Sequence, residues 1–381
     1  MKIGIDARFF GEAGPGRYTK SIIEHLEKVD NKNEYIIFLN SNGMKQYHPK
    51  NSKFTKVEAN YTWYSFEEQT TFLFKVLSQN LDIYYVPHFN IPILYPKKIV
   101  TAIPDMTMHK YSTEKGTTLP LWYFRIKILV YKLVFWWAVF RSEKVIVPSK
   151  TVMKDFLKYL NFKEDKYVLA YEGVDPDLFG SPKTVNETLK KYGITKNFIL
   201  TVGSMYEHKN TQGMLDAYKI LKEKYGYTGQ YVLACKKDKF SKKVYDQIKE
   251  EGLEKDILVL AYKVDSKEKF VVSDQETINL RSKADLYMFA PFTEGFSLTA
   301  MEGMAHGLPA VLSDIDCHRE VYGDSALLVD PHNPKDIAQK ANELLTTPKL
   351  KEDYIKRGYA QIKKYDWLKT AQITLDVFNN I

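Results

Sequence analysis

The chain has 381 residues, of which 44% are hydrophobic and 27% are charged. This length predicts two to three domains, each with its own core, and the composition excludes a disordered chain. The formal net charge of +8 suits anionic ligands, a polyanionic acceptor or a membrane surface, without selecting among them. The two cysteines, Cys235 and Cys317, are too few for a disulfide framework.

Strands alternate with helices through the first half of the chain. The predicted strands are Lys2–Asp6, Glu34–Leu39, Thr55–Ala59, Asp82–Val86, Ile99–Ile103, Lys144–Val147 and Tyr167–Ala170. The predicted helices are Arg17–Lys28, Phe66–Ser78, Leu119–Arg141 and Lys150–Leu160. Such alternation indicates a doubly wound parallel sheet, with binding loops at the carboxyl ends of its strands.

A second series of the same kind follows a loose stretch, Gly173–Lys183, which is rich in Gly and Pro and predicts a linker. Its predicted strands are Asn197–Gly203, Tyr231–Cys235, Ile257–Ala261, Leu286–Ala290, Ala310–Ser313 and Ala326–Val329. Its predicted helices are Thr211–Lys224, Lys242–Glu251, Gln275–Ser282, Leu298–His306, Pro334–Leu345, Leu350–Lys364 and Trp367–Asn379. We therefore expect one domain over 1–178, a linker over 179–193 and a second domain over 194–365.

The most apolar stretch of the chain is Leu119–Phe140. It is nearly long enough to span a bilayer, but Arg125, Lys127 and Lys132 would each cost ~3 kcal/mol near the bilayer centre. Its aromatic and basic content would also suit an interfacial helix, although we expect a core helix of the first domain. Because the chain starts directly with a buried-type strand and shows no signal peptide, we expect a cytoplasmic protein. Peripheral attachment to the inner face of a membrane stays open.

Two carboxylates flank the start of the predicted helix Leu298–His306. Glu294 lies in the loop before it, and Glu302 lies about 7 Å along the helix axis. The free N–H groups at the helix start can hold an anion, so a bound diphosphate would leave its two ends near two different carboxylates. One carboxylate could take ribose hydroxyls and the other sugar hydroxyls, and neither needs a core role. A Glu-Gly turn before a helix is nevertheless more often a solvated surface feature.

The whole stretch from Glu294 to Pro309, with seven residues between its two glutamates, resembles the signature of the retaining glycosyltransferases of family 4. Glu320–Asp330 continues that pattern in register. The resemblance implies an α/β protein of the GT-B fold, with two Rossmann-like doubly wound domains facing a cleft. The first domain would take the acceptor, the second the nucleotide sugar, and the helix over 366–381 would pack back on the first domain.

The resemblance also implies a reaction. A hexose, mannose-like or glucose-like, would move from GDP-mannose or a UDP-sugar to a glycan or lipid-linked acceptor in polysaccharide biosynthesis. The anomeric configuration would be kept, and neither a metal nor another cofactor would be needed. In this reading Lys209 and the amides of Phe296–Leu298 hold the diphosphate, Glu302 the ribose, and Glu294 the sugar hydroxyls. The base would rest in the loop around Lys263–Ser273.

The resemblance implies the following site residues, each taken from a matching position of the family motifs. The catalytic candidates are Glu294, Lys209 and Asp105. The donor-binding candidates are Gly14, Gly16, Ser204, His208, Lys209, Glu294, Gly295, Phe296, Ser297, Leu298 and Glu302. The acceptor candidates are Arg17, His88 and His109, with Asn90 beside His88. On composition alone a lone Lys or His in such loops is more often merely solvated.

Three positions depart from the family pattern. His208 and Ser204 stand where many members have Arg, and a neutral imidazole offers less charge than a guanidinium and no fork. Pro104 precedes Asp105 where the family often has His, and His109 is the alternative for that role. These departures leave two rival functions open, a degenerate sugar-nucleotide-binding or scaffolding protein and a sugar-nucleotide epimerase.

Two other motifs suggest chemistry that we do not expect. The loop from Gly11 to Arg17 lacks the third glycine of the dinucleotide-binding fingerprint, because Thr19 stands in its place. Asp314 and Asp316 resemble a metal-binding pair, but they lie in a loop where the resembling family holds no metal.

Overall fold

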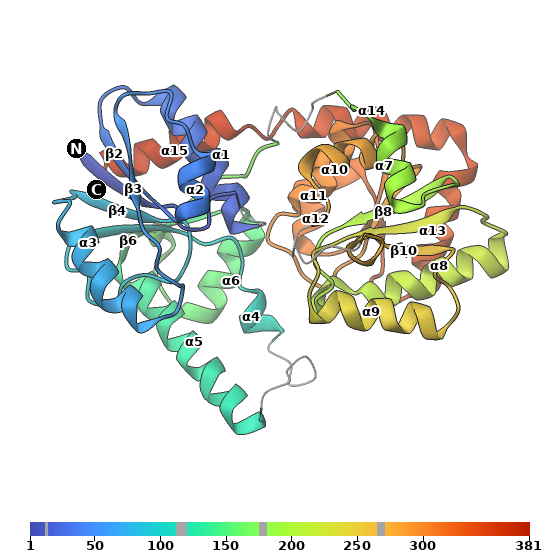
Figure 1. Cartoon of the computed structure of the whole chain (residues 1–381), viewed down its shortest axis with the longest axis horizontal. Helices are drawn as coiled ribbons and strands as arrows, with labels where there is room; N and C mark the ends of the chain where they lie inside the picture. The colour runs from blue at the N-terminus through green and yellow to red at the C-terminus, as the bar shows by residue number, and fades with distance from the viewer. Residues whose placement is uncertain (12–13, 112–119, 175–180, 265–270) are drawn as a thin grey trace. The chain divides into compact units, whose positions relative to one another are not determined.

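The computed structural model describes residues 1–11, 14–111, 120–174, 181–264 and 271–381. The chain forms two compact units (Figure 1). Unit 1 comprises Met1–Gly173 and Asp366–Ile381, and unit 2 comprises Val174–Tyr365. The predicted linker over 179–193 contains a helix, α7 (Val185–Tyr192), which belongs to unit 2.

In the described part of unit 1, seven strands form a sheet in the order β3-β2-β1-β4-β5-β6-β7. The strands are β1 (Lys2–Asp6), β2 (Glu34–Leu39), β3 (Phe54–Glu58), β4 (Ile83–Val86), β5 (Lys98–Ala102), β6 (Ser142–Val147) and β7 (Tyr167–Leu169). The helices are α1 (Pro15–Val29), α2 (Ser41–Gln46), the π-helix η1 (Glu68–Phe72), α3 (Leu73–Leu77), α4 (Thr107–Lys110), α5 (Leu121–Arg141), α6 (Lys150–Leu160), η3 (Glu164–Lys166) and α15 (Trp367–Asn379).

Unit 2 repeats this plan, with a sheet in the order β10-β9-β8-β11-β12-β13 across its described residues. The strands are β8 (Phe198–Val202), β9 (Gln230–Ala234), β10 (Ile257–Val259), β11 (Leu286–Phe289), β12 (Ala310–Ser313) and β13 (Leu327–Val329). The helices besides α7 are η5 (Glu207–Lys209), α8 (Thr211–Tyr225), α9 (Lys239–Glu250), η6 (Leu260–Tyr262), α10 (Asp274–Arg281), α11 (Leu298–Ala305), α12 (Asp316–Val321), η7 (Gly323–Ser325), α13 (Pro334–Thr346) and α14 (Pro348–Ile362).

Every strand pair in the two sheets is parallel. The predicted α/β class is therefore confirmed. In each sheet the direction of winding reverses between two central strands, β1 and β4 in unit 1 and β8 and β11 in unit 2. Loops diverge at such a switch point, which makes the carboxyl edge there the usual place for a ligand.

Helix α15 completes unit 1 although it follows unit 2 in the sequence. The ring of Trp367 is buried and meets the edge of the Tyr18 ring of α1, with the centroids 5.6 Å apart. Gly173 lies so close to this helix that a Cβ there would come within 2.3 Å of the Trp367 backbone nitrogen. Any larger residue at 173 would therefore push the helix away.

The expectation that α5 is a core helix is wrong. Only Phe135, Ala138 and Val139 of its described side chains are fully buried, all near its C-terminal end. Trp122 is 66% exposed and Leu129 is 59% exposed, and in Figure 1 the helix runs outward from the sheet of unit 1. Among the described helices, none combines the length and apolarity that crossing a bilayer requires.

Candidate active site

Two loops of unit 2 meet where neighbouring strands end. Strands β8 and β11 pair directly, with Ile199 opposite Leu286. The loop after β8 leads into η5, and the loop after β11 leads into α11. The Phe292 N–H donates to the His208 carbonyl at 2.8 Å, which ties the two loops together. Residues predicted from separate parts of the sequence therefore share the carboxyl edge at the switch point.

Lys209 and Glu294 form an ion pair across these two loops. Their side chains keep 20% and 11% of their surface exposed, so the pair is largely enclosed yet reachable. The Lys209 ammonium also lies 5.6 Å from the ring centroid of Phe289. Because each charge compensates the other, an anion that binds Lys209 competes with the Glu294 carboxylate. The structure thus brings together the two residues that the sequence nominated for the diphosphate and the sugar.

Asn210 fixes the position of Lys209. It adopts a left-handed backbone conformation (φ 55°) and caps α8, its side-chain oxygen accepting from the Gly213 N–H. Its amide nitrogen donates to the carbonyls of Ala290 at 2.8 Å and Pro331 at 2.7 Å. One buried side chain therefore joins the loop after β8 to two other segments at the same edge. Ser204 and His208 lie partly buried in the same loop.

Helix α11 begins at Ser297, which also has a left-handed backbone (φ 69°). The Ser297 side chain caps no backbone amide of this helix. Its carbonyl instead accepts a hydrogen bond from the Tyr322 hydroxyl. A non-glycine residue in this conformation is strained and persists only where its surroundings hold it. The predicted amides of Phe296, Ser297 and Leu298 thus lie at the start of α11. The hydrogen bond from Tyr322 holds the backbone there in place.

His318 is the second group that holds Ser297, and sequence reasoning missed it. It is fully buried, with Nε2 2.9 Å from the Ser297 hydroxyl and Nδ1 2.9 Å from the Ser313 carbonyl. A carbonyl can only accept, so Nδ1 carries the proton and Nε2 accepts from Ser297. Burial lowers the pKa of His318 to about 4, which keeps the ring neutral. No local sequence pattern identifies His318, because it acts through a contact with Ser297, which lies 21 residues away at the start of α11.

Glu302 has a core role that we did not expect. Its carboxylate forms an ion pair with the Arg281 guanidinium of α10, and both side chains are 1% exposed. The expectation that neither glutamate has a core role is therefore wrong for Glu302. The reason is that Arg281 of α10 reaches the second turn of α11, a contact that the spacing of the two glutamates could not reveal. A role with ribose hydroxyls remains a proposal for this residue.

The candidates of unit 1 lie at the carboxyl edge of its sheet. His88 is buried, and its Nδ1 accepts from the Asn90 N–H at 3.0 Å. Burial lowers the pKa of His88 to about 4 although Asp6 and Asp105 favour its charged form. His109 lies 3.0 Å from the Tyr131 hydroxyl, and burial lowers its pKa to about 4 as well. Both imidazoles are therefore neutral at neutral pH.

The remaining candidates of unit 1 lie at the starts of two helices, α4 and α1. The Asp105 carboxylate accepts from the Thr107 N–H at 2.8 Å at the start of α4. Arg17 is partly buried in the first turn of α1. Gly14 precedes that helix with φ 66° and open space around it, and Gly16 is buried. None of these four positions lies in unit 2, where Lys209 and Glu294 meet.

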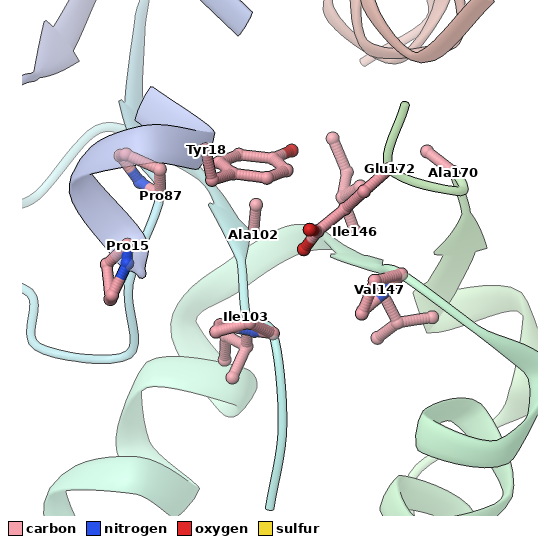
Figure 2. Close-up of a pocket in the computed structure, with 11 residues that line it drawn as sticks. Pro15, Tyr18, Pro87, Ala102, Ile103, Ile146, Val147, Ala170 and Glu172 are labelled. Carbon is pink, nitrogen blue, oxygen red and sulfur yellow. The ribbon is translucent and has the colours of Figure 1, made fainter. Parts of the chain in front are cut away.

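A narrow pocket opens at the same edge of unit 1, between α1 and the ends of β4 to β7 (Figure 2). Its cavity volume is only about 10 Å³, which is room for about one water molecule. Its lining is mostly apolar, and Glu172 is the one carboxyl side chain among the lining residues described. Tyr18 lies beside it with its hydroxyl 2.9 Å from that of Tyr85. The pocket is therefore too small, as it stands, for a ligand larger than water.

Asp314 and Asp316 are both bound by Arg319, at 2.6 Å and 3.1 Å. No group of three or more potential metal ligands occurs among the residues that the structure describes. The arrangement is that of a surface ion-pair cluster. Much of the predicted base-binding loop Lys263–Ser273 lies outside the described residues.

Comparison with known proteins links these units to a family. The sequence profile of the family described as glycosyl transferases group 1 matches residues 185–361, nearly all of unit 2. The chain is 23% identical over 299 residues to O-antigen chain mannosyltransferase B of Escherichia coli, covering 78% of this chain and 74% of that protein. It is 23% identical over 248 residues to an O-antigen chain mannosyltransferase of Salmonella typhimurium, RfbU, covering 65% and 63%.

A third relative is much longer than the matched region. The chain is 24% identical over 249 residues to the serotype-specific mannosyltransferase WbdA of Escherichia coli, covering 63% of this chain and only 29% of that protein.

Solved structures share the fold over the whole chain. HepE of Anabaena, in complex with UDP and glucose, has a TM-score of 0.72 at 15% identity, with 100% of both chains covered. WaaG, a glycosyltransferase involved in lipopolysaccharide biosynthesis, has a TM-score of 0.73 at 14% identity, again with 100% of both chains covered. The GT-B architecture expected from the sequence is thereby confirmed. Residues 185–361 of unit 2 therefore match the glycosyl transferases group 1 family, and together with the mannosyltransferase relatives this match supports a glycosyltransferase enzyme.

Proposed function

We propose that the chain transfers a hexose from a nucleoside-diphosphate sugar to a glycan or lipid-linked acceptor, with retention of the anomeric configuration. The observation that carries this proposal is the Lys209–Glu294 pair, held at the switch point of unit 2 beside the start of α11. A cation and a carboxylate side by side at a helix N-terminus suit a ligand that joins an anion to a polyol.

The chemistry divides between these groups. Lys209 and the backbone N–H groups at the start of α11 stabilise the departing diphosphate, whose negative charge grows as the bond to the sugar breaks. Because the Ser297 hydroxyl already donates to His318, we assign the diphosphate to the amides rather than to that hydroxyl. Glu294, released from Lys209, faces the sugar hydroxyls and the positive charge that develops at the anomeric carbon.

The donor and acceptor are inferred from the relatives. Those named O-antigen chain mannosyltransferases favour a mannose donor and a glycan acceptor. The structure of HepE with UDP-glucose favours a UDP-sugar. The proposal therefore names a mannose-like or glucose-like hexose, and no cofactor besides the nucleotide sugar.

One experiment tests the proposal directly. Thermal stabilisation and slow donor hydrolysis are measured across a panel of nucleotide sugars that includes GDP-mannose and UDP-glucose. We expect one donor to raise the melting temperature and to be hydrolysed slowly, with the released sugar formed first in the donor's anomeric configuration by NMR. Release of the opposite anomer would contradict retention. Interconversion of the intact nucleotide sugar would identify an epimerase, and no response to any donor would leave only a binding or scaffolding role.

We also propose that α5 gives the protein a peripheral contact with an anionic membrane surface. Between Thr117 and Ser142 the sequence carries Arg125, Lys127, Lys132 and Arg141 and no acidic residue. The exposed apolar side chains of the helix are Trp122, Tyr123, Ile126, Leu129, Val130, Leu133, Trp136 and Phe140. Exposed apolar surface of this extent normally has something to cover it, and the uniform positive charge favours anionic lipid over a second copy of the same helix.

A further inference from the structure

Four planar groups stack outward from the core of unit 1. The Arg8 guanidinium lies 4.0 Å from the ring centroids of both Phe72 and Trp63. The Phe9 ring stacks on Trp63 at 3.9 Å, with only 11° between the planes. Since Arg8 and Phe9 both approach the Trp63 ring this closely, they occupy its opposite faces. Phe72 is buried, whereas Trp63 and Phe9 are partly exposed, so the stack leads from the interior to the surface.

A buried polar network fixes the inner end of this stack. Arg8 donates to the Asp6 carboxylate at 2.9 and 2.7 Å and to the Glu68 carboxylate at 2.6 Å. Glu68 also accepts from the Asn90 amide at 2.7 Å, and Asp6 accepts from the Tyr84 hydroxyl at 3.1 Å. All these charged side chains are buried, so each has little freedom to move without losing a partner.

Tyr64, next to Trp63, is exposed in a strained conformation. Its φ is 63°, in the left-handed region that residues other than glycine rarely adopt, and 63% of its surface is exposed. Its backbone N–H donates at 2.9 Å to Glu68, the same carboxylate that binds Arg8. Backbone strain of this kind costs about 1–3 kcal/mol and tends to persist at functional sites. The network therefore holds an aromatic side chain out into solvent at a cost in stability.

The aromatic groups gather at the carboxyl edge of the unit 1 sheet. Arg8 and Phe9 follow β1, Trp63 and Tyr64 follow β3, and His88 follows β4. Strands β1 and β4 flank the switch point. The His88 ring lies 5.4 Å from Trp63 and 6.2 Å from Tyr64, centroid to centroid. Because its Nδ1 accepts from the Asn90 N–H, the neutral ring carries its proton on Nε2, which makes Nε2 a hydrogen-bond donor.

We propose that Phe9 and Tyr64 form an aromatic platform on which a pyranose ring of the acceptor stacks, with Trp63 supporting Phe9 from behind and the His88 Nε2–H donating to one of the sugar hydroxyls. The platform rests on the proposed function and names the acceptor-binding surface of unit 1. A sugar ring presents C–H bonds on its faces and hydroxyls on its rim, which matches rigid aromatic faces with a neutral donor beside them. The network beneath holds two carboxylates and one guanidinium, so its excess negative charge disfavours an anionic lipid headgroup here.

The test uses Tyr64→Gly in the full chain. Glycine accepts the positive φ, so this variant removes the ring without adding strain, and its thermal stability stays at or above that of the wild type. The matched control is Phe66→Ala, which removes an 83% exposed ring two residues away. Methyl α-mannopyranoside and methyl α-glucopyranoside serve as acceptor probes. Saturation-transfer NMR measures their binding, and kcat/KM measures transfer from the donor that the panel identifies.

We expect one of the glycosides to bind the wild type and Tyr64→Gly to lower acceptor kcat/KM at least 10-fold. Donor hydrolysis without acceptor stays within 2-fold of the wild type, and Phe66→Ala changes neither quantity. Donor hydrolysis that is absent from the wild type would refute the proposed function instead, which separates the two failures. Equal losses in Tyr64→Gly and Phe66→Ala, a loss of vesicle binding in Tyr64→Gly, or failure of the wild type to bind either glycoside would overturn the platform.

Discussion

We assign Lys209 to the proposed leaving group, and its ammonium is already bound to Glu294. Removing it should weaken the transition state more than the fold. A hydrogen bond to a charged group contributes about 1.5–3 kcal/mol, so Lys209→Met should lower donor turnover roughly 10- to 150-fold. The matched control is Lys222→Met, which breaks the Lys222–Asp256 ion pair elsewhere in unit 2. Steady-state hydrolysis of the donor should be normal in the control, and an equal loss in both variants would point to a structural effect.

Substitution of Glu302 should mainly lower the free energy of unfolding, whereas substitution of Glu294 should mainly lower donor turnover. Glu302→Leu leaves the Arg281 guanidinium buried without its partner, which costs about 3–5 kcal/mol. Glu294→Leu breaks a pair that is partly exposed and should destabilise the fold less, while turnover falls. Urea unfolding of both variants measures the difference. The double variant Arg281→Met/Glu302→Leu should recover much of the lost stability. Wild-type stability in Glu302→Leu, with a raised donor KM, would instead return Glu302 to a ribose-binding role.

His318 should make the protein acid-sensitive. Its pKa is lowered from 6.5 to about 4 by burial, so the unfolded chain binds a proton more readily between these pH values. Stability is therefore full above about pH 6.5 and is lost as pH falls towards 4, by up to ~3 kcal/mol for this residue. His88, with the same shift, adds to the effect.

Melting temperatures at pH 7.5 and pH 5 measure this loss. His318→Gln should show a smaller difference between the two temperatures than the wild type, and His332→Gln, at an exposed position of the same unit, should not. An unchanged difference in His318→Gln would mean that other groups cause the acid sensitivity.

Helix α5 should bind membranes through both its basic and its apolar side chains. Vesicles with anionic lipid should sediment the protein, and binding should weaken with added salt because Arg125, Lys127 and Lys132 are exposed. Leu129→Glu/Leu133→Glu should reduce binding at least 10-fold by placing charges on the apolar surface. Leu368→Glu, on the exposed side of α15, is the control. Binding that survives the double variant would place the contact elsewhere.

The elements themselves were largely predictable from the sequence. Strand β1, strand β2, helix α6 and helix α15 have the predicted limits, because apolar periodicity and good caps such as Ser149 define them locally. The exposure of α5 was not predictable in this way. An apolar helix looks the same in sequence whether a sheet covers it or ends beside it.

The residues of the candidate active site could likewise be predicted only in part. Lys209 and Glu294 were predictable because their motifs resemble those of a known family, and both follow buried strands that end at one edge. Arg281 and His318 were not, since each acts on a residue far away in the sequence through a contact that only the assembled unit creates. The buried position of Glu302 was missed for the same reason.

For the whole molecule, we expect donor turnover that needs no divalent metal. The two aspartates that resemble a metal pair are bound by Arg319, and Lys209 supplies countercharge at the proposed diphosphate site. Hydrolysis rates should therefore be the same with EDTA and with added manganese. Loss of turnover in EDTA and its recovery on adding manganese would contradict this expectation and return attention to Asp314 and Asp316.

The return of α15 to unit 1 has a consequence for how the protein is made. During synthesis unit 1 emerges first, yet its α1 face and the site beside Gly173 stay uncovered until Trp367 arrives, after all of unit 2. Domains usually complete their folding in the order in which they leave the ribosome. Here unit 2 can complete its folding before unit 1. The apolar surface of unit 1 that α15 covers therefore stays exposed while the ribosome translates unit 2.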